Sequence, residues 1–291
     1  MKALIIGAPG QLGQDLCAVY SDVDLYQADL KGAPITLDIT DEGSVRDCIV
    51  DSLRPDLVIN TAAAHNVPRC EETPDIAYAV NATGARNLAR ACNAAGARLV
   101  HISTDYVYGH GHHEPLTEAV PPAPLSSYGA SKVAGEYLIA AECPEHLIVR
   151  TAAIYGTAPC LAKGGMNFVS LMLHLADKQG WVKVVTDEVT TPTYTEPLAR
   201  QIRLAAEKGE PGLYHMTCQG ACSWYDFTKT IFELTNTEVD LKQATTADFP
   251  SPVKRPTYSV LENAHLQVQG INIMPPWRDA LEAYLKASGR V

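Results

Sequence analysis

The sequence predicts an α/β fold, in which a doubly wound parallel sheet of the Rossmann type is followed by a smaller, interleaved C-terminal region. Three observations carry this prediction. Apolar, strand-like runs alternate with amphipathic stretches through the first half of the chain. A glycine-rich turn follows the first apolar run, between residues 7 and 13. Further along, Tyr128 and Lys132 are spaced by one helical turn.

The elements of the first half follow one another regularly. We predict strands near 2–6, 23–27, 57–60, 98–103 and 146–150, and helices near 11–20, 42–53, 74–95 and 127–142. The pair Ser126-Ser127 favours the start of the last helix, because serine side chains cap helix amino termini. Right-handed crossovers then bring the carboxyl ends of the strands to one edge, where doubly wound sheets bind ligands.

After Arg150 the alternation becomes irregular. We predict helices near 166–178, 196–207, 223–235 and 276–287, strands near 182–186 and 213–216, and a proline-rich segment around 249–256. The expected organisation is a dinucleotide-binding domain over 1–153, which the strand near 182–186 joins, and a mainly substrate-binding region over 154–291. Since no linker, repeat or low-complexity tract separates the two, we expect them to fold together.

Length and charge limit the class of protein. With 291 residues, the chain suits one large domain or two closely joined ones. A formal charge of -10 argues against a nucleic acid or an anionic membrane as a partner. The first strand begins without a cleavable signal before it, and no apolar run approaches the roughly 20 residues that cross a bilayer.

Cysteine and histidine positions do not predict a metal site. The eight cysteines lie at positions 17, 48, 70, 92, 143, 160, 218 and 222, without the paired spacing of a zinc site. We therefore expect reduced thiols in a cytoplasmic protein, and no bound metal. We interpret His110-Gly111-His112-His113 as a solvated loop and His215 as an interior residue.

The glycine-rich turn predicts a dinucleotide site. Gly7, Gly10 and Gly13 follow a strand and open a helix, so the backbone can approach a pyrophosphate at the helix amino terminus. Gln11 and Leu12 complete this turn. The spacing, Gly-x-x-Gly-x-x-Gly, differs from the Gly-x-Gly-x-x-Gly of many dehydrogenases.

Residues after the next strands extend this site. Asp29 ends the second strand, where an acid binds the adenosine ribose and favours NAD, whereas nearby Lys31 suits the 2'-phosphate of NADP. The choice between NADP and NAD stays open. Asp38 and Ile39 can frame the adenine, although a plain loop acid explains Asp38 equally well. The small residues after the strand 57–60 let a dinucleotide lie against the backbone; they are Ala62, Ala63 and Ala64.

The tyrosine and lysine predict chemistry at a carbonyl group. A tyrosine hydroxyl has an ordinary pKa near ~10, and we expect the Lys132 ammonium to lower the pKa of Tyr128. An oxygen that gains negative charge also needs a hydrogen-bond donor. Thr104, at the end of an apolar run, can present one. The sequence therefore predicts a reduction site made of Thr104, Tyr128 and Lys132.

These motifs, in this order, resemble the dTDP-4-dehydrorhamnose reductase family of extended short-chain dehydrogenases/reductases over essentially the full chain. The matching segments are Gly10-Gln11-Leu12-Gly13, Arg54-Pro55-Asp56-Leu57-Val58-Ile59-Asn60, Ser103-Thr104-Asp105-Tyr106-Val107-Tyr108, Tyr128-Gly129-Ala130-Ser131-Lys132, Gly135-Glu136, Asn167-Phe168-Val169, Pro192-Thr193, Ser223-Trp224-Tyr225, Phe227, Arg255-Pro256 and Ser259.

The resemblance implies an NADPH- or NADH-dependent reductase acting on the C4 ketone of a nucleotide-linked deoxysugar, converting dTDP-4-dehydrorhamnose to dTDP-L-rhamnose. It implies that Tyr128 protonates the nascent alkoxide, that Lys132 contacts the nicotinamide ribose and that Thr104 binds the reacting oxygen. It places Tyr106 in the sugar pocket and Arg255 on the sugar diphosphate. The other residues that it assigns to the substrate are Val67, Asp105, Ala153 and Asn167. A homodimer is compatible with it, although no motif specifies one.

Departures from the family pattern cluster where the sugar should lie. Ala153 stands where the family has a tryptophan, which removes a large apolar wall from the pocket. The segments 65–71 and 187–193 also differ from the usual Thr-Ala-Val-Asp-Lys-Ala-Glu and Asp-Gln-x-Gly-x-Pro-Thr. These changes spare Thr104, Tyr128 and Lys132. We expect the hydride chemistry to be retained, and these departures leave the exact substrate open.

Two alternatives keep the fold and change the function. The first is a related nucleotide-sugar epimerase or another ketoreductase; dehydration is disfavoured because Asp105 is followed by Tyr106 and not by a second acid. The second is a non-catalytic, NADP-binding regulatory subunit resembling the beta subunit of methionine adenosyltransferase. The intact set of Thr104, Tyr128 and Lys132 argues against the second.

Overall fold

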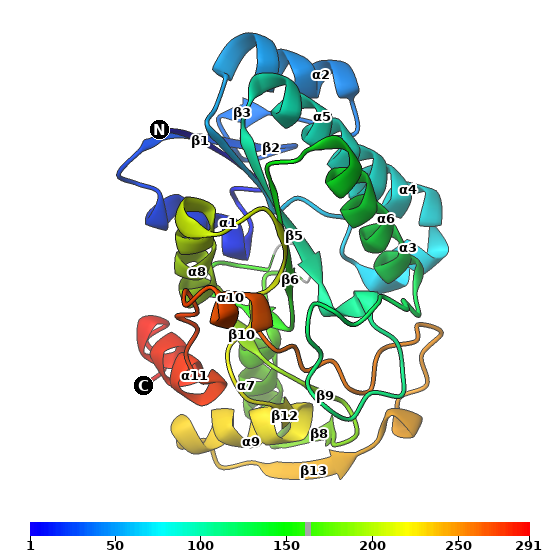
Figure 1. The fold of residues 1–291 in the computed structure, drawn as a ribbon. Helices are drawn as coiled ribbons and strands as arrows, with labels where there is room; N and C mark the ends of the chain where they lie inside the picture. Colours follow the sequence, from blue (N-terminus) through cyan, green and yellow to red (C-terminus); the bar gives the residue numbers. More distant parts are fainter. Residues whose placement is uncertain (161–163) are drawn as a thin grey trace.

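A seven-stranded parallel sheet forms the centre of the computed structural model, which describes residues 1–160 and 164–291 (Figure 1). The strands are ordered β11-β6-β5-β4-β1-β2-β3, and the order reverses between β1 and β4, as in doubly wound folds. The predicted fold class is therefore confirmed. The strands of this sheet are β1 (Lys2–Ile6), β2 (Asp24–Asp29), β3 (Ile35–Thr36), β4 (Leu57–Asn60), β5 (Arg98–Thr104), β6 (His146–Thr151) and β11 (Gly212–His215).

Two helical layers bury both faces of the sheet. The central strands are almost continuously apolar because side chains on both faces are covered; all four residues of β4 are buried. In Figure 1, α2 to α6 cover one face, and α1 and α8 lie on the other. Their bounds are α1 (Gln11–Val19), α2 (Glu42–Arg46), α3 (Val67–Glu72), α4 (Pro74–Tyr78), α5 (Ala85–Ala95), α6 (Ser127–Glu142) and α8 (Thr195–Lys208).

The first layer contains irregular turns that the sequence did not predict. Helix α2 continues into the π-helical segment η1 (Asp47–Leu53), and η2 (Ala79–Gly84) joins α4 to α5. A single 3-10 turn, η3 (Asp105–Val107), follows β5. The two long helices predicted near 42–53 and 74–95 are thus helical throughout, with wider turns inside them.

The smaller region lies beyond the carboxyl end of the sheet (Figure 1). Its helices are α7 (Phe168–Gln179), α9 (Trp224–Leu234), α10 (Ala264–Val268) and α11 (Trp277–Ala287), with a 3-10 turn η5 (Thr246–Asp248). Its strands pair in three ladders: β7 (Ile154–Tyr155) with β10 (Thr193–Tyr194), β8 (Trp181–Val185) with β13 (Asp240–Ala244), and β9 (Val189–Thr190) with β12 (Cys222–Ser223).

The prediction that the strand near 182–186 joins the main sheet is wrong. This strand, β8, pairs with β13 in a two-stranded parallel ladder, and β11 takes the place beside β6. The physical reason is the choice of crossover helix. Helix α8 packs against α1 on the sheet, so the strand that follows α8 enters the sheet. The ladder of β8 lies with α7 and α9 in the smaller region.

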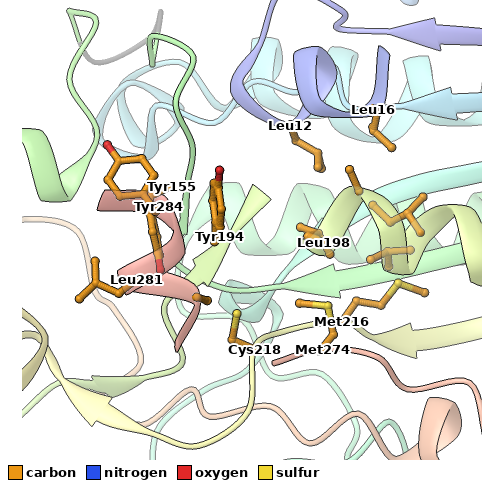
Figure 2. Packing of buried hydrophobic residues seen from close by; sticks show 14 of the residues in the cluster. Leu12, Leu16, Tyr155, Tyr194, Leu198, Met216, Cys218, Met274, Leu281 and Tyr284 are labelled. Carbon is orange, nitrogen blue, oxygen red and sulfur yellow. The ribbon is translucent and has the colours of Figure 1, made fainter. Parts of the chain in front are cut away.

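One hydrophobic core joins the sheet to the smaller region. Figure 2 shows Leu12 and Leu16 of α1 packed near Leu198 of α8, with Tyr194 and Tyr284 beyond them. The Tyr194 and Tyr284 rings lie 5.5 Å apart in an edge arrangement. Because the glycine-rich turn leads directly into α1, this core fixes the smaller region relative to the turn.

Within the described parts of the chain, no helix is both long and apolar enough to cross a membrane.

Candidate active site

The glycine-rich turn connects β1 to α1 at the carboxyl edge of the sheet. Gly7 has a φ of +83°, and a Cβ there would lie 2.2 Å from Thr61 Oγ1. A Cβ on Gly13 would lie 2.2 Å from the Gly7 carbonyl oxygen, so only glycine fits either position. Gly10 begins α1 without a side-chain cap, and no acid lies in the first turn. The N–H groups of that turn are thus available to a pyrophosphate, as a dinucleotide site requires.

The side chains of Gln11 and Leu12 have partners inside the protein. Gln11 Nε2 donates to the Gly156 carbonyl oxygen over 3.2 Å. Leu12 is 3% exposed and packs in the core (Figure 2). The cofactor role that the sequence predicted for these two residues stays a prediction.

The residues expected around the adenosine have different environments. Asp29 ends β2 and accepts a hydrogen bond from the Lys31 backbone over 3.2 Å. A Cβ on Gly32, in the same turn, would lie 3.7 Å from Pro9, so this turn is next to the glycine-rich one. Asp38 Oδ1 binds the backbone and the hydroxyl of Thr40 at 2.9 and 2.7 Å, which favours the loop-acid interpretation.

Ile39 was expected to frame the adenine, yet its side chain packs in the core. A Cβ on Gly84 would lie 2.8 Å from Ile39 Cγ1, and the Ile39 carbonyl oxygen accepts a hydrogen bond from Asn87. The role predicted for its side chain is therefore not supported.

Two asparagines hold the loop of small residues, 62–64. Asn60 Oδ1 accepts from the Ala62 N–H over 3.1 Å. Asn81 Oδ1 accepts from the Ala64 N–H over 2.9 Å, and its amide donates to the Ala64 carbonyl and to Ser131 of α6. Neither asparagine was singled out from the sequence. The sequence signal for both residues was an amide side chain within an apolar strand or helix, because a buried amide needs hydrogen-bond partners.

Helix α6 presents Tyr128 and Lys132 to the end of β5. Ser126 Oγ accepts from the Gly129 N–H over 3.2 Å, which confirms the predicted cap. The Glu71 carboxylate adds bonds to the Ser127 N–H and hydroxyl at 2.6 and 2.9 Å. Lys132 Nζ reaches β5 and donates to the Ile102 carbonyl oxygen over 2.7 Å. Thr104, at the end of β5, lies close enough to Tyr128 to lower the pKa of its hydroxyl group. The three predicted residues are thus brought together.

The expected acidification of Tyr128 is not what the structure shows. Burial raises the pKa of Tyr128, and Thr104 only partly opposes it. Burial also lowers the pKa of Lys132 to about 8, against the opposing charge of Glu136. The prediction failed because it counted the attraction between phenolate and ammonium and omitted the desolvation that disfavours both charged forms.

Tyr106 and Asp105 line the same end of β5. The Tyr106 and Tyr128 rings meet edge to face at 5.7 Å. Burial raises the pKa of Tyr106 to about 12, with Arg255 opposing through its charge and a hydrogen bond. Burial raises the pKa of Asp105 to about 6, with hydrogen bonds from Ser259 and Thr104 opposing.

Arg255 brings the C-terminal segment to this end of the sheet. Together with Glu188, His110 and Lys254 it lines a cavity of about 290 Å³. Burial raises the pKa of the Glu188 carboxyl group, and the positive charge of Arg255 opposes this increase. Arg255 also lowers the pKa of Tyr106, whose ring contacts that of Tyr128, so Tyr106 lies between Arg255 and the predicted catalytic residues.

The remaining predicted substrate residues are Val67, Ala153 and Asn167. Val67 begins α3. Cys70 of the same helix lies close enough to Tyr128 to raise the pKa of its hydroxyl group. Ala153 follows β6 with a left-handed φ of +46°, which is strained for a residue with a Cβ.

Asn167 caps helix α7. Its Oδ1 accepts from the Ser170 N–H over 2.9 Å, and its Nδ2 donates to the Gly156 carbonyl and the Tyr284 hydroxyl at 2.8 and 2.9 Å. Its polar atoms thus have partners inside the protein, and its contact with the substrate stays a prediction.

His215 is the interior residue that the sequence predicted. It is fully buried, and its Nε2 lies 2.7 Å from the Tyr108 hydroxyl. Among residues 1–160 and 164–291, no three His, Cys, Asp or Glu side chains gather in a way that could hold a metal ion.

Comparison with known proteins places this geometry in a family. The model of the RmlD substrate binding domain matches residues 1–289. The spore coat polysaccharide biosynthesis protein SpsK of Bacillus subtilis is 38% identical over 288 residues, covering 98% of this chain and 97% of that protein. The dTDP-4-dehydrorhamnose reductase of Salmonella typhimurium is 34% identical over 289 residues, covering 95% of this chain and 94% of that one.

Solved structures agree in fold over the whole chain. The crystal structure of the dTDP-4-dehydrorhamnose reductase of Bacillus anthracis in complex with NADP has a TM-score of 0.91, 36% identity, and coverage of 98% of this chain and 99% of that one. The resemblance read from the motifs is confirmed: the chain belongs to the RmlD, or dTDP-4-dehydrorhamnose reductase, family of extended short-chain dehydrogenases/reductases.

Proposed function

We propose that this protein uses NADPH or NADH to reduce the C4 ketone of a nucleotide-linked deoxysugar, with dTDP-4-dehydrorhamnose as substrate and dTDP-L-rhamnose as product. One observation carries the proposal. Thr104, Tyr128 and Lys132 meet at the end of β5, on the same edge of the sheet as the uncapped turn of Gly7, Gly10 and Gly13. The names of the relatives and the NADP complex of one of them support it.

A dinucleotide bound at this edge supplies the hydride. The N–H groups that open α1 would hold its pyrophosphate, and the loop 62–64 would lie along it. Lys31, an exposed residue beyond Asp29, is the group that would distinguish NADP from NAD.

Tyr128 would donate the proton to the ketone oxygen as negative charge develops there. A donor must hold its proton at working pH, and the raised pKa of Tyr128 ensures this. The Thr104 hydroxyl lies with Tyr128 and can donate to the same oxygen. Lys132, anchored at Ile102, would hold the ribose next to the ketone.

The cavity beside Tyr106 would take the nucleoside diphosphate. The Arg255 guanidinium offers paired donors for phosphate oxygens, and Tyr106 lies between Arg255 and Tyr128. Ala153 leaves the sugar side without the tryptophan of the family. This substitution favours a nucleotide sugar bulkier than dTDP-4-dehydrorhamnose as a second candidate substrate.

The test is turnover by the wild type and by Tyr128→Phe. NADPH and NADH absorbance is followed with dTDP-4-dehydro-6-deoxy-L-mannose. We expect Tyr128→Phe to lower kcat by about 100- to 10,000-fold, because the general acid is lost, and to leave dinucleotide affinity unchanged. Tyr137→Phe is the matched control, since Tyr137 lies on the same helix and is 65% exposed. Equal rates in the wild type and Tyr128→Phe would refute the assigned proton donor.

The same assay separates the alternative functions. An epimerase would recycle its bound cofactor, so NAD(P)H would not be consumed in proportion to product. A regulatory subunit would bind the dinucleotide, turn over no keto sugar and co-purify with a partner enzyme. A reductase consumes one NAD(P)H per sugar reduced.

A further inference from the structure

Helix α3 lies between the loop 62–64 and the start of α6. On the loop side, the Cys70 thiol donates to the Ala64 carbonyl oxygen over 3.4 Å. On the other side, α3 packs against α6, and Cys70 lies close enough to Tyr128 to raise the pKa of its hydroxyl group. One short helix therefore contacts both the loop expected to lie along the dinucleotide and the helix that carries the expected proton donor.

The Glu71 carboxylate of α3 binds the first residue of α6. Glu71 Oε1 accepts from the Ser127 N–H over 2.6 Å, and Glu71 Oε2 accepts from the Ser127 hydroxyl over 2.9 Å. The first N–H groups of a helix have no partner within the helix, and the helix dipole favours a negative charge beside them. Ser126 serves the N–H of Gly129, and Glu71 serves that of Ser127. Glu71 thus holds the residue directly before Tyr128.

The first turn of α6 is also packed closely against the residues after β5. A Cβ on Gly129 would lie 2.2 Å from the Tyr106 carbonyl oxygen and 3.0 Å from Pro124 Cβ. A proton donor must come within hydrogen-bond distance of its acceptor, and a misplacement of about 1 Å can lower a rate about 100-fold. The contacts that fix this turn therefore decide whether the Tyr128 hydroxyl reaches a carbonyl oxygen.

The loop 62–64 has other anchors besides α3. Asn60 Oδ1 accepts from the Ala62 N–H over 3.1 Å, and Asn81 Oδ1 accepts from the Ala64 N–H over 2.9 Å. The Asn81 amide also donates to Ser131 Oγ, further along α6, over 2.9 Å. Since none of these bonds involves Glu71, its replacement leaves the loop anchored and affects the start of α6 alone.

We propose that Glu71 is a positioning residue, which acts through Ser127 to hold the start of α6 so that Tyr128 meets the reacting carbonyl group. Its effect on turnover rests on the proposed function; its hold on α6 does not. The two bonds to Ser127 require acceptor atoms at a fixed distance from α3, whereas a purely electrostatic role would require only the negative charge. Glutamine separates the two roles. It keeps the side-chain length and one acceptor, and its amide can donate to the Ser127 hydroxyl, which can rotate to accept.

The first test measures turnover of dTDP-4-dehydro-6-deoxy-L-mannose by the full-length variants. We expect Glu71→Ala to lower kcat by about 10- to 100-fold, and Glu71→Gln to recover most of this loss. The dissociation constant of NADPH, from fluorescence titration, should not change. Glu72→Ala is the matched control, because Glu72 is the exposed neighbour on the same helix. A wild-type kcat for Glu71→Ala, or equal losses for Glu71→Ala and Glu71→Gln, would overturn the proposal.

A double variant tests whether Glu71 acts through Ser127. Ser127→Ala removes the hydroxyl and keeps the N–H, so it should lower kcat less than Glu71→Ala does. In the Glu71→Ala background, Ser127→Ala should have no further effect, because the partner of the hydroxyl is already gone. Independent, additive losses would overturn the assigned route.

The last test does not depend on turnover. Hydrogen exchange read by mass spectrometry follows the backbone amides of residues 126–130. In Glu71→Ala we expect them to exchange about ten-fold faster or more, while Glu71→Gln and Glu72→Ala keep the wild-type rate. Unchanged exchange in Glu71→Ala, or faster exchange over the whole chain, would overturn the proposal. If the wild type consumes no NAD(P)H with the keto sugar, the proposed function fails, and this measurement alone decides whether Glu71 holds α6.

Discussion

The Asp105 carboxyl group is buried between the catalytic residues and the C-terminal segment. It accepts a hydrogen bond from the Thr104 hydroxyl over 3.1 Å, yet burial raises its pKa to about 6. At pH values between the ordinary pKa of an aspartate and about 6, Asp105 is protonated in the folded protein and ionised in the unfolded chain. The free energy of unfolding therefore falls as pH rises through this range. Above about pH 6, Asp105 is ionised in the folded protein, and its buried charge destabilises the fold.

Asp105→Asn should remove that cost. Asparagine keeps an acceptor for Thr104 and carries no charge, so we expect the free energy of unfolding to rise by up to about 3 kcal/mol near pH 8. The gain should shrink as pH falls through about 6 and vanish near about pH 4. Urea unfolding of both proteins across this range measures it. The exposed Asp51→Asn is the control; a gain for Asp105→Asn that does not change with pH would contradict the assignment.

At the level of elements, the sequence predicted the strands and helices that have a long apolar pattern. The five strands and four helices of the first half were found within a few residues, because each repeats its period several times. The two-residue strands, such as β9 and β12, contain too few residues to show a period. Helix α3, which Asn66 caps, was not predicted, because its six residues are too few to show a helical period.

Two elements, α6 and β6, are joined by a buried ion pair that periodicity could not reveal. Arg150 forms two bonds to the Glu136 carboxylate, which also accepts from Ser103. Arg150 donates further to the Tyr108 hydroxyl over 2.7 Å, and Tyr108 lies 2.7 Å from His215. This network connects the helix that carries Tyr128 to three strands of the sheet, β5, β6 and β11.

Removing one charge of this pair should destabilise the protein strongly. Glu136→Gln leaves Arg150 buried without its counter-charge, and we expect the free energy of unfolding to fall by about 3–5 kcal/mol. Glu142→Gln is a matched control on the same helix, because Glu142 pairs with the half-exposed Arg90 at 2.8 Å. It should cost about 1 kcal/mol or less. Denaturant unfolding compares the two; equal losses would show that burial does not control the strength of the pair.

At the scale of the whole molecule, the candidate site is assembled from distant segments. Motifs in the first half located the dinucleotide edge and the set of Thr104, Tyr128 and Lys132. Sequence alone could not show that Asn60 and His101 stand behind Lys132, since contact between strands β4 and β5 depends on their register. It also could not show that the polar atoms of Asn167 have partners inside the protein.

Arg255 tests whether the C-terminal segment completes the substrate site. Its guanidinium lies with Tyr106 and Glu188 at the cavity, and a charged hydrogen bond to a phosphate contributes roughly 1.5–3 kcal/mol. We expect Arg255→Gln to raise KM for the nucleotide sugar by about ten-fold or more, since about 1.4 kcal/mol is a factor of ten. KM for NAD(P)H should not change, because the dinucleotide edge is formed by other residues.

Two further variants make the result specific to the guanidinium. Arg255→Lys keeps the charge and loses the paired donors, so its KM for the nucleotide sugar should lie between those of the wild type and Arg255→Gln. Lys254→Gln removes the neighbouring exposed charge and should have an effect within about three-fold, as expected for a solvent-screened cation. If Arg255→Gln and Lys254→Gln raise KM equally, the cavity attracts the diphosphate by its overall charge, and the C-terminal segment does not bind it through Arg255.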